Sequence, residues 1–468
     1  MNLLEKTYGK RENLLKAQRS FPRGNRRKIR HIHSECGIET EITKEMNQSG
    51  IAFSNRIAVK GLQIGTNGKG MSREYALASG YAEFMERAEN GMLASQHLET
   101  ALQPEFGFYH HPDEILADAG AYARDCDETV QRWFRVLNLC TDEEKQAFLL
   151  ALSSLYYGRE DGKIPLFPFI DEFSGKTVYL PVLLTLIATG TNGLAAGNTF
   201  HEAVVQGLSE LFERYVQFEI LRNDLTLPEI PRDAIRFPGI SELIRTIEET
   251  GRYCVRVFDA SLGRGFPVAA ALITDRERGT FGFRFGAHPS FAVALERTLT
   301  EAFQGKQLEE FTSWNRIGAR EEVIADANID LQINNGMGLF QAGLFGDTTS
   351  FAYVPWTAPE EADNRTLLSG MLGILKQNGM RLLVRNNSWL GFPACELIVP
   401  GISEVSLETA SPELLLNNIR YRFQIMNHFP QLDEEERNAL KQALTDSSHW
   451  KWTTSNWRNR CSKRSEDL

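Results

Sequence analysis

Three segments of this chain share one helical pattern, and that pattern narrows the possible folds sharply. In each segment an Ala precedes a Glu by seven residues, as in Ala76 and Glu83, Ala203 and Glu210, and Ala294 and Glu301. Polar residues recur around that Glu at intervals of four and three, which places them on one face of a helix. The residues between are mostly Ala, Leu, Phe, Met or Val. We therefore expect three related helices that pack into a core.

The shared polar face of these helices is rich in carboxylates. Its members are Ser79, Glu83 and Glu86 in the first helix, Glu202, Gln206, Glu210 and Glu213 in the second, with Asn198 before it, and Arg297, Glu301 and Gln304 in the third. Carboxylates gathered in a core repel one another, and burial raises their pKa unless cations compensate. Oxygen ligands suit Mg²⁺, which usually shares its shell with substrate phosphates.

Basic residues accompany the same helices and suit phosphate oxygens. They are Lys69, Arg87, Arg214 and Arg297. A single Glu-x-x-Glu-Arg is most often a solvated face with salt bridges between successive turns. Three aligned copies interleaved with apolar residues favour a buried site instead. The pattern predicts a Mg–nucleotide site built from helix faces.

A glycine-rich stretch, GTNGKG at Gly65–Gly70, precedes the first helix and resembles a phosphate-binding loop. A P-loop needs Ser or Thr after its Lys, but Lys69 is followed by Gly70, and Gln63 stands where the first Gly is required. GTNG recurs at Gly190–Gly193 before the second helix. We interpret the stretch as a glycine-rich turn that is not a P-loop, with Lys69 available to phosphate.

The net charge and the cysteine spacing limit the classes of protein to which this chain can belong. The net charge of -10 over 468 residues argues against a surface made for nucleic acid or membranes. Six cysteines without CxxC spacing favour reduced thiols, and no apolar run reaches the length of a membrane span. A cytoplasmic enzyme is therefore expected. The spacing of His31, His33 and Cys36 is compatible with a transition metal but fits an ordinary loop or strand better.

The order of the elements predicts a mixed α/β fold. We expect strands at 51–59, in VFDAS and in FPVAAALIT, a β-rich run over 177–189, and helices near 201–221 and 240–250. Residues 112–163 are predicted to form a helical covering insertion. Three regions follow: a basic N-terminal segment at 1–50, a catalytic domain at 51–400, and a helical C-terminal segment with a polar tail at 401–468.

These residues resemble the YcaO family of ATP-dependent proteins that activate peptide backbone amides. Its three ATP-site motifs match the three polar faces listed above in order: Ser-x3-Glu-x2-Glu-Arg, Asn-x3-Glu-x3-Gln-x3-Glu-x2-Glu-Arg and Arg-x3-Glu-x2-Gln. The stretches TNGLAAGNT, TLPEIP, FGAHPSFAVALERT and CELIVPG are similar to the enterobacterial form of the family. The similarity covers roughly residues 50–445 and implies a YcaO-type ATP-binding fold.

The resemblance also implies roles for the residues of the three faces. It implies metal binding by Glu83, Glu86, Glu202, Glu210, Glu213 and Glu301. It implies contacts with ATP by Lys69, Ser79, Arg87, Asn198, Gln206, Arg214, Arg297 and Gln304. Which Glu touches which ion stays open, and no catalytic residue is assigned. His288, just before the third helix, is expected to make a structural hydrogen bond rather than approach the nucleotide.

The activity implied by the resemblance is phosphorylation of an amide oxygen by Mg–ATP, which turns that oxygen into a leaving group. A Cys, Ser or Thr side chain, sulfide or an amine then attacks the amide carbon, giving an azoline, a thioamide or an amidine. Expected partners are a peptide or ribosomal-protein substrate, a leader-peptide-binding, sulfur-donating or methylthiotransferase protein, and a second copy in a homodimer. Neither a membrane nor direct nucleic-acid contact is expected.

This sequence departs from the family at two points, and the first concerns azoline formation. Azoline-forming members often end in a Pro-rich PxPxP segment, whereas this sequence ends in NRCSKRSEDL. The enterobacterial form also carries a helical-repeat extension, for which no length remains after about residue 446. That form is associated with β-methylthiolation of an aspartate in a small-subunit ribosomal protein. Because the stretches quoted above are similar to that form, an ATP-binding accessory factor for this modification is the second hypothesis.

Overall fold

The computed structural model describes residues 22–48, 52–62, 64–92, 111–157, 160–303, 307–357 and 361–404, with short stretches at 411–413, 415–416 and 434–435. Gln304 and most of the predicted C-terminal helical segment lie outside these ranges, although residues 412–413, 415–416 and 434–435 are helical. The described part has the predicted mixed α/β architecture. Three of its sheets position the candidate site, and each carries one of the three Glu-bearing helices.

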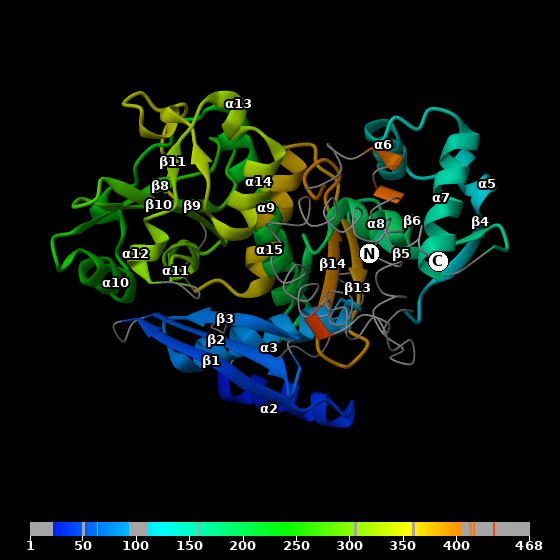
Figure 1. The fold of residues 1–468 in the computed structure, drawn as a ribbon, viewed down its shortest axis with the longest axis horizontal. Helices are drawn as coiled ribbons and strands as arrows, with labels where there is room; N and C mark the ends of the chain where they lie inside the picture. Colours follow the sequence, from blue (N-terminus) through cyan, green and yellow to red (C-terminus); the bar gives the residue numbers. More distant parts are fainter. Residues whose placement is uncertain are drawn as a thin grey trace.

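The first sheet is an antiparallel meander with one helix on its face (Figure 1). Its strands are β1 (Thr40–Gln48), β2 (Ala52–Val59) and β3 (Gly65–Gly70), and the helix that packs on them is α3 (Arg73–Glu89). Ser72 caps α3 by accepting from the backbone N–H of Tyr75. Helix α2 (Pro22–Glu35) packs against α3. We call β1–β3 with α3 the first strand–helix unit; the domain boundary that we placed at residue 50 crosses its sheet.

The second sheet repeats this arrangement. Its strands are β8 (Tyr253–Asp259), β9 (Val268–Asp275) and β10 (Thr280–Ala287), all antiparallel, followed by α11 (Phe291–Glu301) on β10 and β9. Helix α10 (Pro238–Glu248) packs on β8. We call β8–β10 with α11 the second strand–helix unit. Because α11 also contacts β3, the two units meet at that helix (Figure 1).

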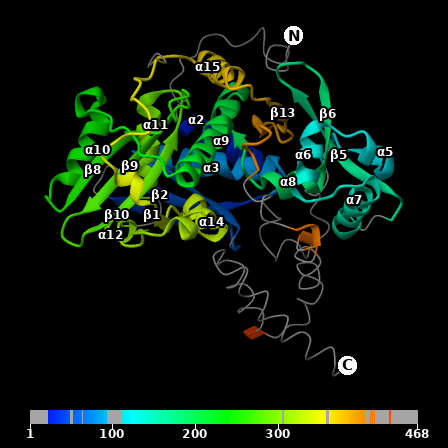
Figure 2. The ribbon, with the colours of Figure 1, turned by 90° about the horizontal axis from the view of Figure 1, so that it is seen from above.

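The third sheet has six strands and supports the longest of the three helices. The strands run in the order β4 (Ile115–Asp118), β5 (Lys163–Asp171), β13 (Leu383–Asn386), β14 (Ala394–Ile398) and β7 (Leu194–Ala196), with β6 (Thr177–Pro181) paired to β5. Helix α9 (Phe200–Asn223) packs on β7 and β14. Helix α15 (Asn364–Gln377) and α14 (Asp326–Asn335) contact α9 from opposite sides (Figure 2).

The helices that lie between β4 and β7 in the chain share a hydrophobic core with strands of the third sheet. They are α5 (Ala119–Arg124), α6 (Glu128–Val136), α7 (Asp142–Tyr157) and α8 (Val182–Thr189), which lie beside β4, β5 and β6 (Figure 1). The β-rich interpretation of 177–189 was wrong in its second half, because the chain turns into α8 after Pro181. Every position there is apolar or small, so periodicity could not separate a buried strand from a buried helix.

The remaining elements, apart from η1, lie between β10 and α15 in the chain. They are α12 (Leu308–Phe311), β11 (Arg316–Ile317), α13 (Arg320–Val323), β12 (Leu339–Phe340) and the 3₁₀ turns η1 (Arg232–Ala234), which precedes α10, and η2 (Ala342–Phe345). The expected strands over 51–59, VFDAS and FPVAAALIT are confirmed as β2, β8 and β9 within the described residues. None of the helices formed by the described residues has a stretch long and apolar enough to cross a bilayer.

The GTNGKG stretch is a strand and not a turn, which corrects our interpretation. Residues 65–70 form β3 and pair with β2, Gly68 facing Asn55 in the register. A Cβ at Gly68 would overlap the carbonyl oxygen of Ala76 and the amide nitrogen of Gly80, so glycine lets α3 approach the strand closely. The second GTNG has another structure, since Gly190 ends α8 with a φ of 57° and Gly193 lies in the turn before β7.

Candidate nucleotide and metal site

Helices α3 and α9, which pack on different sheets, bring several of the predicted carboxylates together. On α3, Arg87 lies 3.9 Å from Glu83 and 3.4 Å from Glu86, measured between guanidinium nitrogen and carboxylate oxygen. On α9, Arg214 lies 2.8 Å from Glu210. The charge of Glu210 acts on both Glu83 and Glu86, so the polar faces of α3 and α9 converge in one cluster.

The positive charges near this cluster do not fully compensate its carboxylates. Burial raises the pKa of Glu86 to about 8, against the pull of Arg87, and the charges of Glu210 and Glu83 raise it further. Burial likewise raises the pKa of Glu83 and of Glu213 above the usual range of a Glu. Burial thus disfavours the negative charge of these carboxylates, and a divalent cation beside them would offset that cost.

Two cations, Lys69 and Arg297, connect helix α11 to the other parts of the site. Lys69, near the end of β3, contacts Glu301 on α11 and so joins the two strand–helix units. Arg297, one turn earlier on α11, donates to Gln206 on α9 and, at 2.9 Å, to the carbonyl oxygen of Ala287. The N–H of Ala287 donates to Glu213 at 3.1 Å. Backbone and side chains thus connect α9, β10 and α11 at one point.

The electrostatic balance at this end is opposite to that beside α3. Burial lowers the pKa of Lys69 to about 8, and Arg284 and Arg297 lower it further while Glu213 opposes them. Burial also lowers the pKa of Arg284 on β10 to about 10, against the pull of Glu213. The site is therefore rich in carboxylates beside α3 and rich in cations beside β10 and α11.

The start of α9 forms a separate pair. The Nδ2 atom of Asn198 donates to both carboxylate oxygens of Glu202, at 2.9 and 3.0 Å, and Thr199 caps the helix by accepting from the N–H of Glu202. Glu202 and Glu213 lie on the same helix, so the rise per residue puts about 16 Å between them along its axis. Ser79 is half-buried one turn before Glu83, and Gln304 lies outside the described residues.

Sequence reasoning missed two cations of the site. Arg284 lies in β10, and Arg56 in β2 acts electrostatically on Glu83. The signal for Arg284 was present in the sequence, because it is the one charged residue in the otherwise apolar strand TFGFRFGA. Nothing in the sequence showed that this strand lies beside α9, since that follows from tertiary packing.

The isolated histidines have structural roles. His33 is buried with its ring 4.6 Å from that of Phe84, whereas exposed His31 pairs with Glu35 at 3.4 Å, so the two do not converge on a metal. His288 accepts from the N–H of Ser290 at 3.0 Å, which confirms the expected structural hydrogen bond before α11.

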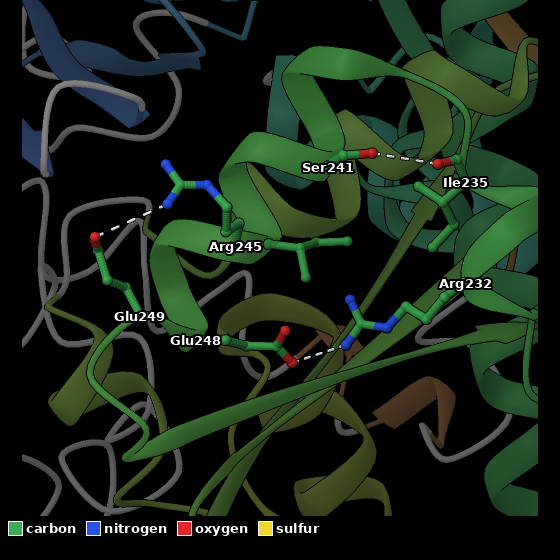
Figure 3. Close-up of a pocket in the computed structure, with 7 residues that line it drawn as sticks. Arg232, Ile235, Ser241, Arg245, Glu248 and Glu249 are labelled. Atoms are coloured by element: carbon green, nitrogen blue, oxygen red, sulfur yellow. Dashed lines mark hydrogen bonds and ion pairs between the residues drawn. The ribbon is translucent and has the colours of Figure 1, made fainter.

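A surface pocket beside α10 does not include the predicted residues. It has a volume of about 410 Å³ and is lined by Arg232, Ile235, Ser241, Ile244, Arg245, Glu248 and Glu249 (Figure 3). Its charges already pair with one another, Arg232 with Glu248 at 2.7 Å and Arg245 with Glu249 at 3.9 Å. This pocket therefore gives no reason to move the candidate site.

The donor set fits Mg²⁺ that is bound together with phosphates. Within the part of the chain that the structure describes, no three Asp, Glu, His or Cys side chains are gathered closely enough to hold a metal ion by themselves. The carboxylates of α3 and α9 are nevertheless all-oxygen donors, and burial raises the pKa of Glu83, Glu86 and Glu213 among them. Such donors suit an ion that takes the rest of its shell from water and substrate phosphates.

Comparison with known protein families decides among the interpretations of this cluster. Residues 67–403 match the model of the YcaO cyclodehydratase family, described as ATP- and Mg²⁺-binding. The chain belongs to the YcaO family. The match begins in β3 and ends beyond β14, so it takes in all three Glu-bearing helices. ATP and Mg²⁺ are the ligands of the YcaO family, in agreement with the chemistry of the cluster.

Individual relatives agree with this assignment. The chain is 30% identical over 379 residues to the Escherichia coli "Ribosomal protein S12 methylthiotransferase accessory factor YcaO", covering 80% of this chain and 63% of the relative. It is 33% identical to an uncharacterised Haemophilus influenzae protein, covering 73% and 58%. The chain therefore spans about three-fifths of the length of these two relatives.

A solved structure shares the fold. The "Heterocyclase in complex with substrate and Cofactor" superposes with a TM-score of 0.54 at 20% sequence identity, covering 84% of this chain and 54% of the other. At that identity the likeness shows the YcaO-type fold alone. It confirms the fold class predicted from the sequence.

Proposed function

We propose that this YcaO protein uses Mg–ATP to phosphorylate the oxygen of a peptide backbone amide, for cyclodehydration or thioamidation of a ribosomally made peptide. The observation that supports this most is the divided charge of the site. Glu83 and Glu86 on α3 and Glu213 on α9, whose pKa values are raised by burial, face a group of cations on β3, β10 and α11. A metal–triphosphate complex needs both kinds of surface at once.

The residues take roles that follow from this division. Glu83, Glu86, Glu210 and Glu213 would hold Mg²⁺, and Lys69, Arg87, Arg214 and Arg297 would hold phosphate oxygens. Bound Mg²⁺ would neutralise the charge that develops during phosphoryl transfer. Asn198 and Glu202, at the start of α9 and far from Glu213, would contact the opposite end of the nucleotide complex or a further ion.

The proposed reaction balances without a further reagent. The amide oxygen takes the phosphoryl group and leaves as phosphate after a Cys, Ser or Thr side chain, sulfide or an amine has added to the amide carbon. ADP and phosphate are released, and the former amide oxygen ends in the phosphate. The direct test is a peptide labelled with ¹⁸O at the amide, incubated with the protein, Mg²⁺ and ATP. Mass spectrometry should find ¹⁸O in the phosphate; unlabelled phosphate throughout turnover contradicts the proposal.

A second candidate function rests on a different observation. The E. coli relative is named as an accessory factor of a ribosomal protein S12 methylthiotransferase. An ATP-binding accessory role in that aspartate modification would need the same site but no amide activation. Phosphate release measured with and without peptides separates the two. No stimulation by any peptide, together with loss of S12 methylthiolation after deletion of the gene, favours the accessory factor.

Partners are part of this proposal. A peptide-binding, sulfur-donating or methylthiotransferase protein would deliver or use the activated substrate. The homodimer implied by the family resemblance stays a prediction, which the mass of the protein in solution checks.

A further inference from the structure

Arg284 on β10 is bonded differently from Lys69, Arg87 and Arg214. Arg87 and Arg214 lie beside carboxylates of their own helices, and Lys69 contacts Glu301. Among the described residues, Arg284 has no carboxylate within ion-pair distance. Its hydrogen bond there joins Nη2 to the carbonyl oxygen of Asn335 at 2.6 Å, at the end of α14.

The backbone after α14 holds the Arg284 guanidinium in place. Gly336 has a φ of 61°, and a Cβ on it would overlap the guanidinium group. The Nε atom of Arg284 is buried and has no hydrogen-bond partner among the described residues. The group is therefore oriented by one neutral acceptor while part of its donor capacity is unused.

The same guanidinium belongs to the electrostatic cluster of the site. Glu213 on α9 attracts it, and its own charge lowers the pKa of Lys69. A cation in a poorly solvated place without a carboxylate partner lacks the compensation that buried charges usually have. An anion bound beside Lys69 would supply that compensation.

A purely structural role does not account for this placement. A guanidinium can stabilise a helix end by binding its last carbonyl groups, and Arg284 does so for α14. In the first strand–helix unit, however, the matching position is Thr66, whose hydroxyl donates to the carbonyl oxygen of Gly80 at 2.8 Å. The packing of strand on helix therefore works without a long cation at this position.

We propose that Arg284 is a phosphate-binding residue of the nucleotide site, held by the Asn335 carbonyl so that its guanidinium contacts the phosphate chain and not the nucleoside. A planar guanidinium with free donors suits two phosphate oxygens at once. This inference rests on the proposed Mg–ATP site and adds a residue to its cation-rich side.

The experiment compares nucleotide affinities without turnover. Binding of a non-hydrolysable ATP analogue with Mg²⁺, and of adenosine, is measured by calorimetry on the full chain for the parent, Arg284→Met and Arg284→Lys. Arg284→Met should weaken binding of the analogue roughly 10- to 100-fold, with Arg284→Lys in between. Adenosine affinity should change less than twofold. The matched control is Arg316→Met, because Arg316 also donates to backbone carbonyls but is exposed on β11.

The outcomes separate this inference from the proposed function. If the parent binds the analogue and Arg284→Met binds it equally well with a lower melting temperature, Arg284 only anchors α14 and the inference fails. If the parent itself does not bind Mg–nucleotide, the proposed function fails as well. Equal losses for the analogue and for adenosine also overturn the inference, because they indicate a general distortion.

A measurement on the parent protein covers the case in which Arg284→Met does not fold. Phenylglyoxal modifies arginine side chains, and mass spectrometry of peptides reports the modified positions. ATP analogue with Mg²⁺ should protect Arg284 at least fivefold, whereas adenosine should not, and Arg316 should be modified equally in both. Absence of protection at Arg284 by a saturating analogue overturns the inference.

Discussion

The two strand–helix units are built alike but contribute different charged residues to the site. In both, the third strand of an antiparallel sheet places a glycine against its helix, Gly68 against Gly80 and Gly286 against Thr298. The first unit then presents Glu83 and Glu86, while the second presents Arg284 and Arg297. One scaffold used twice thus provides a carboxylate wall, Glu83 and Glu86, and a cation wall, Arg284 and Arg297. Helix α9 contacts β9 and β10 of the second unit, and the charge of its Glu210 acts on both carboxylates of the first.

The difference teaches how the site avoids the repulsion that the sequence implied. Six carboxylates on three helices would be unstable if they all faced one another. Instead, Glu301 contacts Lys69 from the opposite unit, and Glu210 pairs with Arg214. The deficit of positive charge is concentrated at Glu83, Glu86 and Glu213, which is where a divalent ion would stabilise the protein most.

The largest expected effect comes from breaking the carboxylate wall. Glu83→Ala or Glu210→Ala should lower Mg-dependent phosphate release at least 1000-fold, about 4 kcal/mol, and weaken Mg–ATP binding, because the metal loses a ligand. The matched control is Glu219→Ala on α9, whose side chain accepts from Asn223 instead. Parent-like Mg–ATP affinity in both variants would mean that the carboxylates do not hold the metal.

The next prediction tests whether an added methyl group between strand and helix destabilises both units equally. A Cβ at position 68 meets only backbone atoms of α3, whereas one at 286 first meets the Thr298 hydroxyl and then backbone. Gly68→Ala should therefore lower the free energy of unfolding by about 3 kcal/mol, and Gly286→Ala by somewhat less. Urea unfolding measures both.

Gly370→Ala provides the control for the glycine variants. Gly370 lies in α15 with open space around it, so alanine there should leave stability unchanged or raise it by up to about 1 kcal/mol through its helix propensity. A Gly68→Ala variant as stable as the parent would show that α3 can move away from β3. The common architecture of the two units would then be looser than the glycine contacts indicate.

A third prediction concerns the helix that covers only the first unit. Buried His33 on α2 packs on Phe84 of α3, and burial lowers its pKa to about 4 from an ordinary 6.5. The folded state thus excludes a proton that the unfolded chain binds. Stability from this group is complete above pH 6.5 and falls as the pH drops towards 4.

The measurement is thermal or urea unfolding of the parent and His33→Phe. Between pH 7 and pH 5 the parent should lose about 2 kcal/mol that the variant retains. His31→Phe, at an exposed position of the same helix, is the control and should behave like the parent. Identical acid dependence of the parent and His33→Phe would assign the acid sensitivity to other groups.

Much of the carboxylate wall was predictable because it depends on helical period. Glu83 with Glu86, and Glu210 with Glu213, fall on one helix face wherever the helices lie. Strand pairing has no such local signature. The GTNGKG stretch is a strand because it pairs with β2, and Arg284 reaches the site because β10 packs beside α9. The sequence also could not show that Lys69 reaches Glu301 from another unit, since 232 positions separate them.

The smallest effect on stability is expected for an exposed ion pair that joins α3 to β1 in the first unit. Arg73 at the start of α3 lies 2.8 Å from Glu45 on β1, but the two side chains are 50% and 41% exposed. Solvent screens such a pair, so Glu45→Gln should change the free energy of unfolding by about 0.5 kcal/mol or less, and high salt should abolish the difference. A double cycle with Arg73→Met isolates the pair. A coupling energy above about 1 kcal/mol between Arg73 and Glu45 would show that surface charge stabilises the first unit together with the packing at Gly68. A smaller coupling energy leaves the Gly68 contact as the main source of that stability.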